Sequence, residues 1–344
     1  MLYGAVASHA WNDEPRWGIY ARDGRLVDAA AYYRGPGKLT VGQTMWVDRA
    51  AIPAGDAPDE TYIYGGIFIQ HFGHFLLSSL GRFWPFVDNA LRARLGPYRI
   101  LCHGMSGPDH WWTFPYKAEP LQALGIPKER LAWFAEPTRV RRLIVPRPAF
   151  EEHNFVHDAY VRLTREVGTR LLRGGGPVVP AGPAYLSRTD YPQISQGFDE
   201  EATLSAAVAG LGVQVVFPEA LSLADQIRMV TGRPVVAGFI GSAFHAAAFS
   251  PDPARLLMLS PTHVIGANFG LLDRAAGLRA QYFHVGGKLL DVSNTARIIN
   301  RFRMGDPDGA ARDLLGLIQA ACTAEANPGR PGGVAAAHMQ GCTP

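Results

Sequence analysis

Apolar and polar residues are grouped along the chain into short hydrophobic runs, separated by longer segments with a helical period. Runs of four to six residues that are rich in valine, isoleucine, leucine and aromatics predict buried strands. Strands that alternate with helices are typical of βαβ units and of parallel sheets. The strands are predicted at 62–64, 99–102, 131–134, 140–145, 184–187, 213–217, 234–237 and 255–259.

The same pattern predicts helices between these strands. From Phe72 to Leu95, apolar residues recur every three or four positions, and Pro85 predicts a kink or break within this segment. Ser222 and Asp225 have the spacing of a capping box, which marks a helix start. The remaining helices are predicted near Leu121 and at 158–172, 199–211, 242–249 and 309–322.

A cluster of glycine and proline at 174–183 divides the chain into two regions of similar organisation. A length of 344 residues fits two domains better than one. We therefore expect an α/β protein with two Rossmann-like lobes. Residues 1–172 form the first lobe and 173–322 the second, while the Gly/Pro/Ala-rich tail at 323–344 is expected to be disordered.

Composition and charge exclude several classes of protein. Hydrophobic residues make up 47% of the chain, which excludes global disorder, and the net charge of only +3 argues against a nucleic-acid binder. The three cysteines lie far apart, so neither a zinc knuckle nor a disulfide framework is expected. The start of the chain lacks a basic segment, and no apolar run reaches the length of a membrane span. These features predict a soluble, cytoplasmic protein.

Two histidines at the start of the segment from Phe72 are the first candidates for chemistry. His71 and His74 are three residues apart, so they are expected on similar sides of a helix start. The positive end of the helix dipole disfavours imidazolium, so a neutral histidine there suits a general base near pH 7. The structural alternative is a histidine pair that only bonds to local backbone groups. Zinc binding by this pair is not expected, because the sequence suggests no third ligand.

A second group of candidates follows the predicted strands of the C-terminal half. Gly241, Ser242 and Ala243 form a small-residue turn into a helix, where backbone N–H groups could hold a phosphate. Arg188 and Glu219 each follow a strand, at the sheet edge where ligands bind in open α/β folds. Arg188 could clamp a diphosphate and Glu219 could accept from ribose hydroxyls. Each candidate also has a structural alternative. The turn at Gly241 could be free of ligand, Arg188 could form a surface ion pair, and Glu219 could be an acid at a helix start that the helix dipole stabilises.

One further motif has a structural explanation. Asp306 and Asp308 form an Asp-x-Asp pattern, which binds a divalent metal in some sugar transferases. Because they directly precede the last predicted helix, we expect Asp308 to serve as its N-cap instead.

Three segments in a fixed order resemble glycosyltransferase family 61. They are 185–188 (Tyr-Leu-Ser-Arg), 217–227 with its Pro-Glu-x-Leu-Ser helix start, and the small-residue loop at 238–245. The segment around His71 and His74 resembles the N-lobe helix of that family. No single motif is specific, but their order and spacing together are.

The resemblance implies a GT-B architecture, in which two Rossmann-like lobes face a central cleft. It implies inverting transfer from a nucleotide-sugar to a glycan acceptor without a bound metal or other cofactor. In bacterial relatives the products are capsular or other cell-surface polysaccharides, so peripheral contact with the inner membrane face is an added expectation. The donor would lie on Arg188, Glu219, Gly241, Ser242, Ala243 and His245, and His74 or, as second candidate, His71 would be the base.

Two departures from the family pattern leave an alternative open. Relatives commonly carry an acidic residue in the helix where this chain has Ser78 and Ser79. Many relatives also read His-Gly-Ala-Gly in the C-terminal loop, where this chain reads Ile-Gly-Ser-Ala at 240–243 and has His245 one turn later. A non-catalytic relative that binds a sugar-nucleotide or a glycan is therefore the second hypothesis.

Overall fold

Two parallel sheets form the framework of the protein. The computed structural model describes residues 2–4, 17–40, 42–176, 178, 181–189, 196–285, 289–291 and 300–326. The first sheet has the order β6-β5-β4-β8, with β4 Thr61–Ile67, β5 Arg99–His103, β6 Leu131–Ala132 and β8 Arg142–Ile144. The second has the order β13-β11-β14-β15-β16, with β11 Ala184–Leu186, β13 Gln214–Val216, β14 Val235–Phe239, β15 Arg255–Ser260 and β16 Ala280–His284.

Both sheets are parallel throughout, so the expected mixed α/β class with parallel sheets is confirmed. The remaining strands form three smaller sheets. These are β1 Leu2–Gly4, β2 Gly18–Tyr20, β3 Gly55–Asp56 and β7 Thr138–Arg139; β9 Phe150–Glu151 and β10 Phe155–Val156; and β12 Gln196–Phe198, β17 Leu289–Asp291 and β18 Asn300–Met304.

Helices connect and cover the strands. Most lie where the sequence predicted them, but α3 and α8 were not predicted. They are α3 Pro108–Trp111, α4 Pro115–Ala123, α5 Asp158–Gly174, α6 Glu201–Gly210, α7 Leu223–Val230, the 3-10 helix η8 Ser242–Phe249, α8 Ala267–Ala276 and α9 Pro307–Ala326. In the described part of the chain, none of them has the length and apolar character needed to cross a bilayer.

Two predicted helix starts can be compared with the structure. Ser222 is the N-cap of α7 and accepts from the backbone N–H of Asp225, as the capping box predicts. At the last helix the prediction was wrong by two residues. Asp306 caps α9 by accepting from the N–H of Gly309 at 2.8 Å, and Asp308 lies within the first turn. The predicted tail begins inside α9, and its part beyond residue 326 lies outside the described residues.

The long helix predicted from residue 72 to 95 is replaced by five short helical segments. These are α1 Phe72–His74, a π-helical turn at Phe75–Ser79, 3-10 turns at Leu80–Arg82 and Trp84–Val87, and α2 Asn89–Arg94. Pro85 sits at the start of the second 3-10 turn, because it cannot donate within a longer helix. The π turn is fully buried, so packing and not local propensity sets its geometry.

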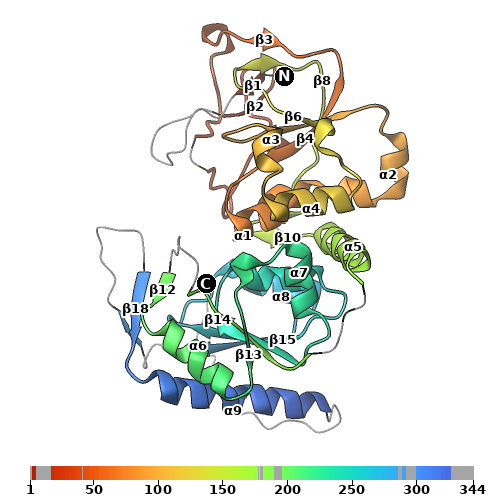
Figure 1. Ribbon diagram of the computed structural model, residues 1–344. Coiled ribbons are helices and arrows are strands. Elements are labelled where there is room, and N and C mark those ends of the chain that lie inside the picture. The colour runs from red at the N-terminus through yellow and green to blue at the C-terminus, as the bar shows by residue number, and fades with distance from the viewer. Residues whose placement is uncertain are drawn as a thin grey trace.

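One hydrophobic cluster joins the first sheet to the helices that connect strands of the second sheet. Leu163 and Val167 of α5 belong to the same buried cluster as Ile227 of α7 and Phe249 of η8. Figure 1 shows the sheets at opposite ends of the molecule, with α1, α4, α5 and α7 between them. A Cβ at Gly168 of α5 would lie 1.9 Å from the carbonyl oxygen of Phe249, so only glycine permits this approach. At this point α5 and η8 are therefore packed backbone against backbone.

Candidate functional site

The two groups of residues that the sequence singled out meet where α1 packs against η8. A Cβ at Gly73 would lie 2.8 Å from Cβ of Ser242 and 3.5 Å from Cδ2 of His245. Glycine at this position thus allows α1, which carries the two histidines, to contact the start of η8 at Ser242. His71 and His74 flank Gly73, so the structure brings both candidate groups to one place.

His71 and His74 lie side by side but have different surroundings. Their ring centroids are 4.5 Å apart, and Nδ1 of His71 accepts from the backbone N–H of His74 at 3.5 Å, as an N-cap of α1. Burial, together with the neighbouring His74, lowers the pKa of His71 to about 4. His71 is therefore a neutral imidazole at physiological pH, and burial is the largest cause of its low pKa.

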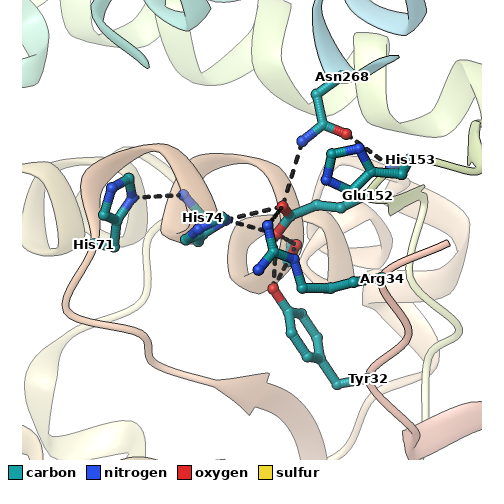
Figure 2. A network of polar contacts seen from close by, with 8 residues as sticks. Tyr32, Arg34, His71, His74, Glu152, His153 and Asn268 are labelled. Atoms are coloured by element: carbon teal, nitrogen blue, oxygen red, sulfur yellow. Dashed lines mark hydrogen bonds and ion pairs between the residues drawn. The ribbon is translucent and has the colours of Figure 1, made fainter. Parts of the chain in front are cut away.

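His74 pairs with a carboxylate that the sequence analysis did not identify. Its Nδ1 lies 2.9 and 3.0 Å from the two oxygens of Glu152, whose side chain is fully buried between β9 and β10. Figure 2 shows the imidazole of His74 directed at this carboxylate. The hydroxyls of Tyr32 and Ser78 donate to the same carboxylate oxygen at 2.7 and 2.6 Å.

Two further side chains complete the surroundings of Glu152. A guanidinium nitrogen of Arg34 lies 3.4 Å from one carboxylate oxygen, and Nδ2 of Asn268 donates to that oxygen at 3.3 Å. Asn268 belongs to α8, and its Oδ1 accepts from the backbone N–H of His153 at 2.7 Å. His153 has φ +61°, a left-handed conformation that this bond helps to hold (Figure 2).

These partners decide the charge of Glu152. Burial alone would raise the pKa of its carboxyl, but hydrogen bonds from His74, Ser78 and Tyr32 hold that pKa well below its usual range. Burial and the charge of Glu152 in turn raise the pKa of Tyr32 far above its ordinary value. Glu152 is therefore an ionised acceptor, and Tyr32 is a permanent donor to it.

A second cluster lies at the carboxyl edge of the C-terminal sheet. Arg188 follows β11, and its Nη1 would be 3.3 Å from a Cβ placed on Gly241, which follows β14. The guanidinium carbon lies 5.3 Å from the ring centroid of Phe198. Nε and Nη2 of Arg188 are buried and have no hydrogen-bond partner among the described residues. Glu201 accepts from the backbone N–H of Arg188 at 3.0 Å.

The other predicted donor-site residues lie around this edge. Gly241, Ser242 and Ala243 form the N-terminal turn of η8, where the first N–H groups have no partner within a helix. Glu219 lies exposed in the 3-10 turn Pro218–Ala220, which follows β13, and interacts electrostatically with Arg188. His245 is buried, which lowers its pKa to about 4, and its Nδ1 has no hydrogen-bond partner in the described part of the chain.

The family model of glycosyltransferase 61 matches residues 72–257, more than half of the chain. The chain belongs to glycosyltransferase family 61. The predicted family is thus confirmed, and a family of this kind implies a sugar donor and an acceptor as substrates. No curated protein matches the chain.

The family 61 match covers most, but not all, residues of the candidate site. It includes His74, Glu152 and Arg188, but Tyr32 and Asn268 lie outside it. The serine pair that departs from the family pattern lies inside it. Ser78 donates directly to Glu152, so this serine lies beside a carboxylate that the β9–β10 hairpin supplies.

Sequence reasoning missed Tyr32, Arg34, Glu152 and Asn268. Tyr32 lies 120 residues before Glu152 along the chain and Asn268 lies 116 residues after it, so no local motif contains them. Glu152 is one of two consecutive acids in a short hairpin, a pattern that gives no sign of burial. Asn268 opens a helix that was not predicted at all.

Proposed function

We propose that this protein is an inverting glycosyltransferase that moves a sugar from a nucleotide-sugar to a glycan acceptor. The two parallel sheets would be the Rossmann-like lobes of a GT-B arrangement, divided near residues 172 and 173 in the last turn of α5. One observation supports this proposal above all others. Nε and Nη2 of Arg188, which have no partner within the described residues, and the turn at Gly241 lie on the edge that meets α1.

In this proposal the C-terminal sheet holds the donor. Nε and Nη2 of Arg188 are buried and find no partner in the part of the chain that the structure describes, so an anionic diphosphate would satisfy them. The N–H groups of Gly241, Ser242 and Ala243 would support the same diphosphate, since a helix N-terminus favours negative charge. Glu219 would accept from the ribose. His245, whose Nδ1 has no hydrogen-bond partner among the residues described, would face the donor from the side of α1.

The transfer would be a single displacement at the anomeric carbon. The acceptor hydroxyl attacks this carbon from the face opposite the diphosphate and forms the new glycosidic bond, while its proton moves to the histidine base. The bond from the anomeric carbon to the diphosphate oxygen breaks, and its electron pair leaves with the nucleoside diphosphate. Fixed N–H donors aimed at this leaving group stabilise the developing charge, and no bound metal is required in this scheme.

The cellular setting is part of the same proposal. A family 61 enzyme with this donor site would build capsular or other cell-surface polysaccharide in a bacterium. It would act in the cytoplasm or at the inner membrane face, where nucleotide-sugars are made.

Calorimetry with a panel of nucleoside diphosphates tests the donor site. We expect the wild type to bind at least one of them, and Arg188→Ala to weaken that binding by about 10- to 100-fold, because a hydrogen bond to a charged group is lost. Arg233→Ala is the matched control, since Arg233 bonds Gly182 and Gln214 near the start of β13. Unchanged affinity in Arg188→Ala would contradict the assignment.

A further inference from the structure

We propose that Glu152 is a positioning residue that makes His74, and not His71, the base of the transfer reaction. It does so by fixing the proton of His74 on Nδ1, which leaves the lone pair of Nε2 for the acceptor hydroxyl. This inference rests on the proposed transferase function and assigns a role within it. The argument uses only the contacts of the two histidines and of the carboxylate.

The first step concerns the tautomer of His74. An ionised carboxylate can only accept hydrogen bonds, so the nitrogen that faces both oxygens of Glu152 must carry a proton. In neutral imidazole the other nitrogen then holds the lone pair. The side chain of His74 is 23% exposed while that of Glu152 is fully buried, so only the histidine can be reached by a substrate.

The second step excludes His71. Its Nδ1 accepts from the backbone N–H of His74, so the proton of neutral His71 lies on Nε2. Because Nδ1 of His71 already accepts a hydrogen bond and Nε2 carries the proton, His71 has no lone pair that could take a proton from a substrate. The low pKa of His71 agrees with this, because a weakly basic imidazole is a poor proton acceptor. His71 therefore acts as the cap of α1.

The third step concerns the rigidity of the carboxylate. Glu152 is held by Tyr32, Ser78 and Arg34, in addition to His74, so its two oxygens cannot rotate away from the imidazole. Its remaining partner, Asn268, comes from α8 and links the carboxylate to the part of the chain that carries the proposed donor site (Figure 2). A base held in this way needs little reorganisation when the proton is transferred.

The experiment compares wild type with Glu152→Gln, which keeps the side-chain volume and removes the charge. The first readout is ¹⁵N NMR of histidine-labelled protein. We expect Nδ1-protonated His74 in the wild type, and a mixed or reversed tautomer in Glu152→Gln, because the amide can also donate to the ring. The second readout is steady-state transfer, in which kcat falls by about 10²- to 10⁴-fold while the donor KM stays within about threefold.

A matched control tests whether any half-buried acid between the two sheets has the same effect. Glu119 of α4 accepts from the backbone N–H of Ala224 in α7 at 2.8 Å, away from the histidines. We expect Glu119→Gln to keep the wild-type kcat and the wild-type His74 tautomer. His71→Ala should retain much more activity than His74→Ala, since its ring is only a cap.

Several outcomes would overturn the inference. These are an Nε2-protonated His74 in the wild type, a Glu152→Gln enzyme with wild-type kcat, or a loss of kcat that is matched by loss of nucleoside diphosphate binding and of thermal stability. The last outcome would show a purely structural role. If the wild type transfers no sugar, the proposed function fails, yet the wild-type NMR spectrum still tests the Glu152–His74 pair separately.

Discussion

Lys117 is the residue whose burial is hardest to reconcile with its chemistry. It lies in α4 with only 1% of its surface exposed, and its Nζ has no hydrogen-bond partner in the described structure. The ammonium is 4.6 Å from the ring centroid of Phe114 and 5.7 Å from that of Tyr116. Aromatic faces thus replace the carboxylate that usually accompanies a buried lysine, and cation–π attraction offsets part of the desolvation.

Replacement of this lysine by methionine is expected to stabilise the protein at neutral pH. Burial lowers the pKa of Lys117 to about 8, from an ordinary value of 10.5. Below pH 8 the folded state must hold a buried charge, so Lys117→Met should raise the free energy of unfolding by roughly 1–3 kcal/mol at pH 7. Denaturant unfolding of both proteins at pH 7 measures this difference.

The sign of the pH dependence gives a second check on the same variant. Between the folded pKa near 8 and the unfolded value of 10.5, the unfolded state binds more protons, so wild-type stability gains from rising pH. The advantage of Lys117→Met should therefore shrink as pH rises through this window. If the difference in unfolding free energy between variant and wild type stays constant from pH 7 to pH 10, Lys117 does not titrate as its burial implies.

Among the elements, the contact of α1 with η8 is the one on which the site depends. Gly73→Ala places a methyl group 2.8 Å from Cβ of Ser242, so one of the two elements must shift. We expect a loss of about 1–3 kcal/mol in unfolding free energy, as is usual for overpacking, together with weaker nucleoside diphosphate binding.

A second substitution, at Ser242, should reverse the effect of Gly73→Ala. The double variant Gly73→Ala/Ser242→Gly lacks the Cβ of residue 242 that clashes with the new methyl group. Its nucleoside diphosphate affinity and its free energy of unfolding should therefore return toward the wild-type values, apart from the cost of the added glycine. Failure of the double variant to recover either property would mean that the Gly73–Ser242 contact does not set the distance between α1 and η8. Thermal unfolding and calorimetry provide both values.

Elements formed by short, strongly apolar runs were predictable from the sequence. Strands β5, β14 and β15 are buried over nearly their whole length, and their apolar runs Ile-Leu-Cys, Val-Val-Ala and Leu-Leu-Met-Leu indicate this burial. The helical period from Phe72 onward indicated burial correctly but not the helix type. The turns from Phe75 to Arg82 are wholly buried, so neighbouring elements determine whether they become α, π or 3-10.

At the scale of the whole molecule, the shared core predicts cooperative unfolding. One buried cluster contains side chains of the first sheet and of α5, α7 and η8, so neither half of the molecule can unfold without exposing this shared core. We expect a single calorimetric transition with equal van't Hoff and calorimetric enthalpies. Two resolved transitions would show that the core between the sheets contributes little.

Gly168 offers a targeted perturbation of that core. Gly168→Ala brings a methyl group within 1.9 Å of the Phe249 carbonyl oxygen and should cost roughly 3 kcal/mol, at the upper end for overpacking. Gly210→Ala in α6 is the matched control, because no atom outside its own helix lies within 4 Å of the added Cβ. A similar melting temperature for both variants would contradict the close packing of α5 on η8.

The site was predictable only where it is local. His74, Arg188 and Gly241 each stand in a short segment whose strand, turn and helix signals are adjacent in the sequence. The carboxylate that orients His74 could not be predicted, because its partners at positions 32, 34, 78 and 268 are assembled by tertiary packing alone.

That assembly also limits how the chain can be shortened. Tyr32, Arg34 and Asn268 are three of the five groups that hold Glu152, and all three lie outside the region 72–257. A fragment trimmed to that region would bury an ionised acid with only a serine and a histidine beside it. Such a fragment would expel the acid into water or take up a proton, and in either case the imidazole would lose its orientation.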